Sequence, residues 1–251
     1  MGKKVWAVAK INLKNIKSPY FTTGLVFGVI FVQSIVYTII AFAKDTAGEQ
    51  LQISGGCYFW LLIIMAAIFI PSKNFRRIIH LGGKREDFFW GSLTCHAVLA
   101  GAVAVANTVF YHTYERFLVN TSYYADFEAF VQNPAIMDNH YINVNVIDVF
   151  GWSGNGVILS ILQQFAFLFL LAAVIHTLTA MQDKWYGWVA DAAIAAILAV
   201  FIPIAPLRGA LVWFFGLIIF QPNAFLQITA CLILAMLTYS LNKSLFARKA
   251  I

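Results

Sequence analysis

The feature that most constrains this chain is a series of long apolar runs, each the length of a helix that crosses a membrane. Such a helix needs roughly 20 mostly apolar residues. Runs of this kind cover residues 20–43, 56–72, 89–111, 156–180, 187–206 and 224–242. Because 61% of the residues are apolar and only 11% are charged, the composition also lies outside the range of soluble domains. We therefore expect an all-α membrane protein, with six transmembrane helices in a single domain over 1–251.

A further apolar segment, LVWFFGLIIF at 211–220, is too short to cross comfortably and is followed by Gln221-Pro222-Asn223. It predicts a re-entrant or interfacial element between helices 5 and 6, which a membrane tolerates when protein covers its loose backbone groups. The first run has no clear small-residue cleavage site behind it, so we expect it to remain as a span rather than to be removed as a signal peptide. Pro71 marks the expected end of the second run.

The basic residues indicate the orientation of the chain. With six spans, fourteen of the 17 Lys and Arg fall on one side and three, Lys44, Arg116 and Arg208, fall on the other. Basic segments resist translocation, which places both termini in the cytoplasm of a multi-pass plasma-membrane protein. This topology explains the net charge of +6. No basic cluster is interleaved with stacking aromatic residues, so nucleic-acid binding is not indicated.

The first 19 residues have an amphipathic pattern. On a helical wheel, KKVWAVAKINLKNIK places its spaced lysines on one side and Val5, Trp6, Ala9, Leu13 and Ile16 on the other. This pattern predicts an interfacial helix over 1–19, whose apolar face enters the headgroup layer while its lysines meet anionic lipid or an acidic partner. The residues expected at the membrane interface are Lys3, Trp6, Lys10, Leu13, Lys14 and Lys17.

A compact basic segment, RRIIHLGGKREDFFWG, separates the second run from the third. Gly82-Gly83 is expected to stop the preceding helix, because glycine is costly inside a helix and readily adopts positive φ at its end. Glu86 and Asp87 then fall in the first turn of the next helix, where acids suit the positive end of the helix dipole. A solvated connector would explain the charges but not so tight a turn. The apolar residues expected beside the charges are Ile78, Ile79 and Leu81.

The wider run NFRRIIHLGGKREDFFWGSL resembles the first cytoplasmic loop of bacterial ABC-2-type permeases, where an arginine-containing segment leads into a glycine turn and the third span. The layout is similar too, with a basic amphipathic N-terminal helix, six spans and a broken apolar element before the last span. Where this chain has Lys84, the family often has a small polar residue. The resemblance implies that the chain is the membrane subunit of a bacterial ABC exporter, in which 73–88 is a coupling loop that docks on a separate ATPase subunit.

By this resemblance the partners would be ABC ATPase subunits, a second permease that is identical or a paralogue, and membrane lipid. The chain has no G-x-x-x-x-G-K-[ST] sequence, so the partner would bind ATP and Mg²⁺ and hydrolyse the ATP, and this chain is predicted not to be an enzyme. An apolar interior with few charges favours a hydrophobic or amphipathic cargo, such as a peptide, an antibiotic or a lipid-like molecule. The residues expected to contact the ATPase are Arg76, Arg77, His80, Leu81, Gly82, Gly83, Lys84, Arg85, Glu86 and Asp87.

Two other classes of function are compatible with the composition. A non-transporting immunity or sensor subunit would bind an extracellular peptide through residues 112–155. An intramembrane protease resembling rhomboids would use Ser153 in GWSGNG, but such a serine needs a nearby histidine. His176 lies more than about 30 Å further along the same expected helix. His112 and Glu115 could share a helical face, but two ligands do not define a metal site, and none is predicted.

Polar residues within the runs are candidates for a transport pathway, since intramembrane ionisable groups usually face a bundle interior or a water-filled path. They are His96, Asn107, His176 and Asp191. The two histidines could instead be hydrogen-bonded between helices, and Asp191 could simply reach the headgroups. In the predicted outer loop, 112–155, the alternation of YINVNVIDV indicates a short strand or packed edge. This loop could gate an exit or meet substrate, or it could only pack over the ends of the spans.

Overall fold

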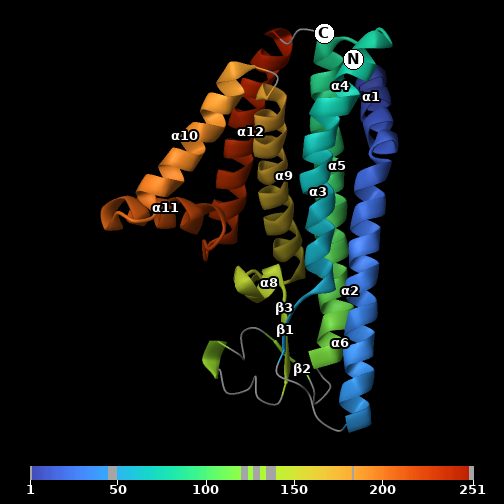
Figure 1. Cartoon of the computed structure of the whole chain (residues 1–251), viewed down its shortest axis with the longest axis vertical. Coiled ribbons are helices and arrows are strands. Elements are labelled where there is room, and N and C mark those ends of the chain that lie inside the picture. The colour runs from blue at the N-terminus through green and yellow to red at the C-terminus, as the bar shows by residue number, and fades with distance from the viewer. Residues whose placement is uncertain are drawn as a thin grey trace. The chain divides into compact units, whose positions relative to one another are not determined.

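The structure, a computed structural model, describes residues 2–44, 50–119, 124–126, 131–133, 140–182 and 184–248 (Figure 1). Parts of the predicted outer loop 112–155, together with Lys249, lie outside these residues. Within the described residues, five helices are long and apolar enough to cross a membrane, and a bent pair of helices makes a sixth if it is counted as one broken span. The chain is therefore a predominantly helical membrane protein.

Most helices follow the predicted runs, several with longer ends. The run 187–206, expected to form one span, is divided instead: one helix ends at Phe201, and the next begins at Ala205 after a bend. The long elements are α2 (Lys17–Lys44), α3 (Trp60–Phe69), α5 (Arg85–Phe110), α9 (Val157–Met181), α10 (Trp185–Phe201), α11 (Ala205–Ile218) and α12 (Ala224–Arg248), with the N-terminal α1 at Gly2–Asn15. After α5 the helix continues through the π-helical turn η3 (Tyr111–Glu115) and α6 (Arg116–Val119), so residues 112–119 are helical rather than part of a loop.

The helix of the second run does not end at Pro71. The helix passes through a π-helical turn, η2 (Ile70–Asn74), and continues as α4 (Phe75–His80). Proline lacks the N–H that an α-helix interior requires, but a π turn already departs from the regular hydrogen-bond ladder, so the missing donor is accommodated there. The first half of the predicted 73–88 loop is consequently helical.

Two compact units make up the chain, the first from Met1–Lys17, Ile63–Gly101 and Gln163–Ile251, the second from Ser18–Leu62 and Ala102–Leu162. In the first unit, α10 and α11 meet at a bend of 118°. Figure 1 shows α11 lying across the direction of α9 and α12. A short helix in this position leaves carbonyl groups unpaired at its end. Here the Ile218 carbonyl accepts from Gln227 Nε2 at 3.0 Å and from Cys231 Sγ at 3.5 Å, both on α12.

The second unit contains a small parallel sheet in the order β1-β3-β2, from β1 (Gln50–Ile53), β3 (Tyr141–Val144) and β2 (Tyr124–Asp126). The predicted strand in YINVNVIDV is confirmed over Tyr141–Val144, but the chain then turns into the short helix α8 (Val146–Val149). Beside the sheet, Tyr141 stacks on Tyr37 of α2 with ring centroids 5.6 Å apart, and it packs in one buried cluster with Ala41 and Leu118.

Candidate functional site

The turn between α4 and α5 has the geometry that Gly82-Gly83 predicts. Gly82 has φ +81°, and its N–H donates to the Ile79 carbonyl at 3.0 Å. The N–H of Gly83 donates to the Ile78 carbonyl at 2.9 Å. These two bonds form a Schellman motif, which satisfies the last carbonyls of α4. A Cβ on Gly83 would lie 2.6 Å from Ile78 Cγ2, so the second glycine permits this close approach.

Charged groups surround the exposed tip of this turn. Among the predicted contact residues, Gly83, Arg85 and Asp87 are half-buried, whereas seven are exposed: Arg76, Arg77, His80, Leu81, Gly82, Lys84 and Glu86. Leu81 exposes 72% of its surface. The expectation that Ile78 and Ile79 are presented beside the charges is wrong, because Ile78 is buried and Ile79 is half-buried. A single apolar side chain therefore projects among the cations.

Three aromatic rings fasten the turn to the helices beneath it. Phe75 of α4, Phe88 of α5 and Phe246 of α12 are all buried, and their ring centroids are 4.9 to 5.1 Å apart. Aromatic contacts at this separation are favourable beyond the area that they bury. These contacts join α4, immediately before the turn, to α5 and α12.

The N-terminal helix is attached to the same region by buried amides. Asn74 Nδ2 donates to Asn12 Oδ1 at 3.1 Å, and Asn12 Nδ2 donates to Ser92 Oγ at 3.4 Å. Asn12 is fully buried, while Trp6 is 56% exposed, so the packed face of α1 differs from the predicted apolar face. Leu13 is half-buried, and the predicted interface lysines Lys3, Lys10, Lys14 and Lys17 are all exposed.

Replacing Gly82 with alanine is expected to destabilise the turn by about 1 kcal/mol, because an L residue at this positive φ is strained. Amide hydrogen exchange over 78–84 should accelerate by about fivefold as the turn opens more often. Gly154→Ala is the matched control, since a Cβ at Gly154 would meet no atom within 4 Å and that position has no positive φ. Equal exchange in the two variants would contradict the role of Gly82.

The intramembrane histidines are brought together by a residue that the sequence did not single out. His96 Nδ1 lies 2.6 Å from Tyr239 Oη of α12, and the His96 and His176 ring centroids are 4.9 Å apart. The expectation of hydrogen bonding between helices is thus confirmed for His96. Tyr239 is one aromatic residue in an apolar run, and no local signal marks its hydroxyl. Asp191 lies elsewhere and accepts from Gln182 Nε2 at 2.5 Å.

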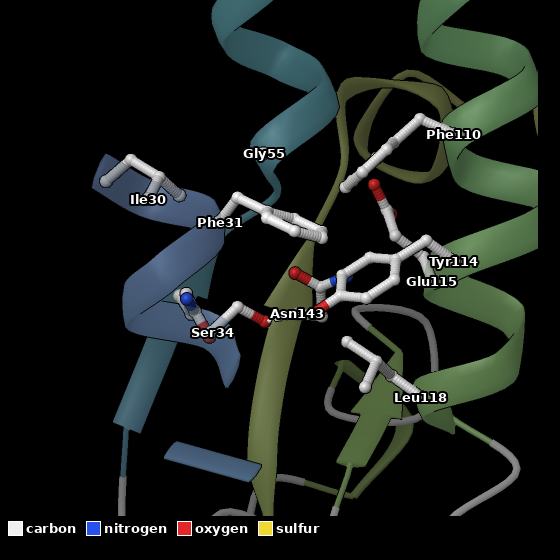
Figure 2. Close-up of a pocket in the computed structure, with 10 residues that line it drawn as sticks. Ile30, Phe31, Ser34, Gly55, Phe110, Tyr114, Glu115, Leu118 and Asn143 are labelled. Atoms are coloured by element: carbon white, nitrogen blue, oxygen red, sulfur yellow. Dashed lines mark hydrogen bonds between the residues drawn. The ribbon is translucent and has the colours of Figure 1, made fainter. Parts of the chain in front are cut away.

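Asn107 belongs to a buried polar cluster in the second unit. Asn145 Nδ2 lies 3.4 Å from Asn107 Oδ1 and 3.0 and 3.1 Å from the two carboxylate oxygens of Glu115. Ser54 Oγ also donates to Glu115. Figure 2 shows Glu115 and Asn143 beside a cavity of about 10 Å³, among the rings of Phe31, Phe110 and Tyr114. Glu115 thus takes part in a hydrogen-bonded core cluster. Its spacing from His112 along one helix did not indicate these partners.

The glycine-rich GWSGNG segment forms the turn before α9, with Ser153 in the short 3-10 helix Ser153–Asn155. The segment is therefore a turn before the helix Val157–Met181, which is long and apolar enough to span a membrane. Within the described residues, no three His, Cys, Asp or Glu side chains are grouped as metal ligands.

No protein-family model, curated protein or solved structure matches this chain. A function for this chain must therefore be inferred from its own residues and their arrangement. Of the clusters described, the α4–α5 turn is the one whose charged side chains and projecting leucine, Leu81, are exposed.

Proposed function

We propose that this chain is the permease subunit of an ATP-driven ABC exporter of the ABC-2 type, coupled through residues 73–88 to a separate ATPase subunit. The single observation that carries the proposal is the capped turn at Gly82-Gly83. It presents Leu81 among exposed cations and is fastened to α5 and α12 by the rings of Phe75, Phe88 and Phe246. An exposed apolar residue within a charged rim has the anatomy of a docking site.

The distribution of charge supports the same role. The positive-inside rule favours a topology in which the turn and both termini lie on the cytoplasmic side of the plasma membrane. An ATPase subunit is accessible on that side. Charge complementarity sets the rate and register of docking, while Leu81 fills an apolar pocket of the partner. The N-terminal helix, attached through Asn12 and Asn74, lies at the inner interface with its exposed lysines toward anionic lipid.

The proposed mechanism is a population shift between two states of the permease. ATP binding closes a pair of ATPase subunits, their movement displaces the turn, and the aromatic contacts carry this displacement into α5 and α12. The pathway lies between this chain and a second permease, an identical copy or a paralogue. ATP acts only through its differential affinity for the two states. The cargo is hydrophobic or amphipathic, because the spans carry few charged groups that could solvate an ion.

Co-expression with a candidate ABC ATPase subunit tests the proposal. The permease should retain the ATPase through affinity and size-exclusion chromatography, and ATP should be hydrolysed by the complex but not by the permease alone. A chain that purifies without a nucleotide-binding partner would favour the immunity or sensor alternative.

The orientation is tested separately by cysteine labelling. In a variant without Cys57, Cys95 and Cys231, a cysteine replacing Lys84 should react with an impermeant maleimide only after cells are permeabilised. A cysteine replacing Ser153 is the control and should react on intact cells. Labelling of position 84 on intact cells would contradict the cytoplasmic placement of the turn.

A further inference from the structure

A cavity of about 320 Å³ lies in the first unit between α9, α11 and α12. Its walls include Leu170 and Val174 of α9, Phe215 and Ile218 of α11, and Leu234 and Thr238 of α12. The bend of 118° between α10 and α11 places α11 as the third wall. The bonds from Gln227 and Cys231 to the Ile218 carbonyl then hold the end of α11 against α12.

The chemistry of the lining is almost wholly apolar. All the residues that line the cavity belong to the described part of the chain, and among them Thr238 supplies the one hydroxyl group. This hydroxyl donates to the Leu234 carbonyl within α12 at 2.8 Å. A polar ligand would lose its hydrogen bonds to water without gaining partners here. The occupant must therefore be a hydrocarbon group.

The position of the cavity along the helices places it inside the bilayer. Leu170 and Val174 lie near the middle of the span Val157–Met181, and Leu234 and Thr238 lie near the middle of Ala224–Phe246. Neighbouring side chains of α12 that point outward are large and apolar, among them Ile233, Met236 and Leu237, each more than half exposed. The cavity is thus bordered by an apolar surface that contacts lipid chains in the membrane.

The size of the cavity decides between hydrocarbon occupants. A partner helix is about 10–12 Å wide with its side chains and does not fit. The volume lies at the lower end of the roughly 300–1,000 Å³ that ligand pockets enclose, which suits one flexible chain. We propose that this cavity is a binding site for a single acyl chain of a membrane phospholipid, which fills the space between α11 and the two spans.

Photolabelling in lipid nanodiscs tests the site without the ATPase. The probe is a phosphatidylglycerol that carries a diazirine at the end of one acyl chain. Cross-links located by mass spectrometry should concentrate on the cavity residues of α9, α11 and α12, at least fivefold above Ile233 and Leu237 on the outward surface of α12. In native mass spectrometry of the unmodified chain, one phospholipid per chain should remain bound after delipidation.

Val174→Trp fills the cavity and should reduce its cross-links and the retained lipid at least fivefold. Val174 is partly exposed, so the larger side chain can be accommodated without disrupting a fully buried contact. Val212→Trp on the outward side of α11 is the control and should change neither measurement. Labelling spread evenly over the outward apolar surface, or labelling unaffected by Val174→Trp, would overturn the proposal. So would displacement of the probe by a single-chain amphiphile but not by unlabelled phospholipid.

Discussion

Reversing three exposed cations, as Arg76→Glu, Arg77→Glu and Lys84→Glu together, is expected to abolish retention of the ATPase subunit by this chain. Each reversal removes an attraction worth up to about 1 kcal/mol at an exposed site and adds a repulsion of similar size. Three reversals should therefore weaken binding by on the order of 3 kcal/mol or more, at least about 100-fold in Kd. Binding of the purified ATPase to the permease in micelles, measured at two salt concentrations, checks this result.

The matched control carries the same change in charge at exposed cations outside both the turn and α1, as Lys44→Glu, Lys184→Glu and Arg208→Glu. It should bind the ATPase nearly as well as the natural chain. Equal loss in both triple variants would mean that overall charge, rather than the α4–α5 turn, governs the association. Unchanged binding in the first variant would remove the turn from the proposed mechanism.

Asn145→Leu is expected to lower the free energy of unfolding by roughly 3 kcal/mol. Its amide donates to both carboxylate oxygens of buried Glu115, and its Oδ1 accepts from the Ile147 N–H at 2.9 Å, which caps α8. Leucine removes the cap and leaves a buried carboxylate short of donors, and both losses are destabilising. Thermal unfolding in micelles should show a fall in Tm of roughly 6–12 °C.

A second substitution separates the two contributions. In the Asn145→Leu background, Glu115→Gln should recover at least about 1 kcal/mol, because a neutral amide needs less compensation for burial than a carboxylate. Alone, Glu115→Gln should cost much less than Asn145→Leu, since one amide oxygen can still accept from Asn145. A Tm for Asn145→Leu within one degree of the natural chain would show that the cluster contributes little to stability.

The site was foreseeable where its structure is local. Gly82-Gly83 ends a helix because positive φ and a missing Cβ are properties of the glycines themselves, and Glu86 and Asp87 start α5 for an equally local reason. The burial of Ile78 was not foreseeable. Its neighbour on α4, Phe75, packs on α5 and α12, whose Phe246 lies far along the chain. The same limit applies to Asn12 and Asn74, which read separately as ordinary polar residues of two helices.

The sequence by itself determined that the chain is a helical membrane protein, where its long helices lie and where one of them stops. Transfer of apolar side chains from water and the chemistry of a turn both act within a window of neighbouring residues. Only the tertiary structure decided that Gln50–Ile53 pairs with Tyr141–Val144, that Glu115 meets Asn145, and that α11 lines an apolar cavity with α9 and α12. These features depend on which distant segments come into contact, and a pattern of neighbouring residues does not encode that choice.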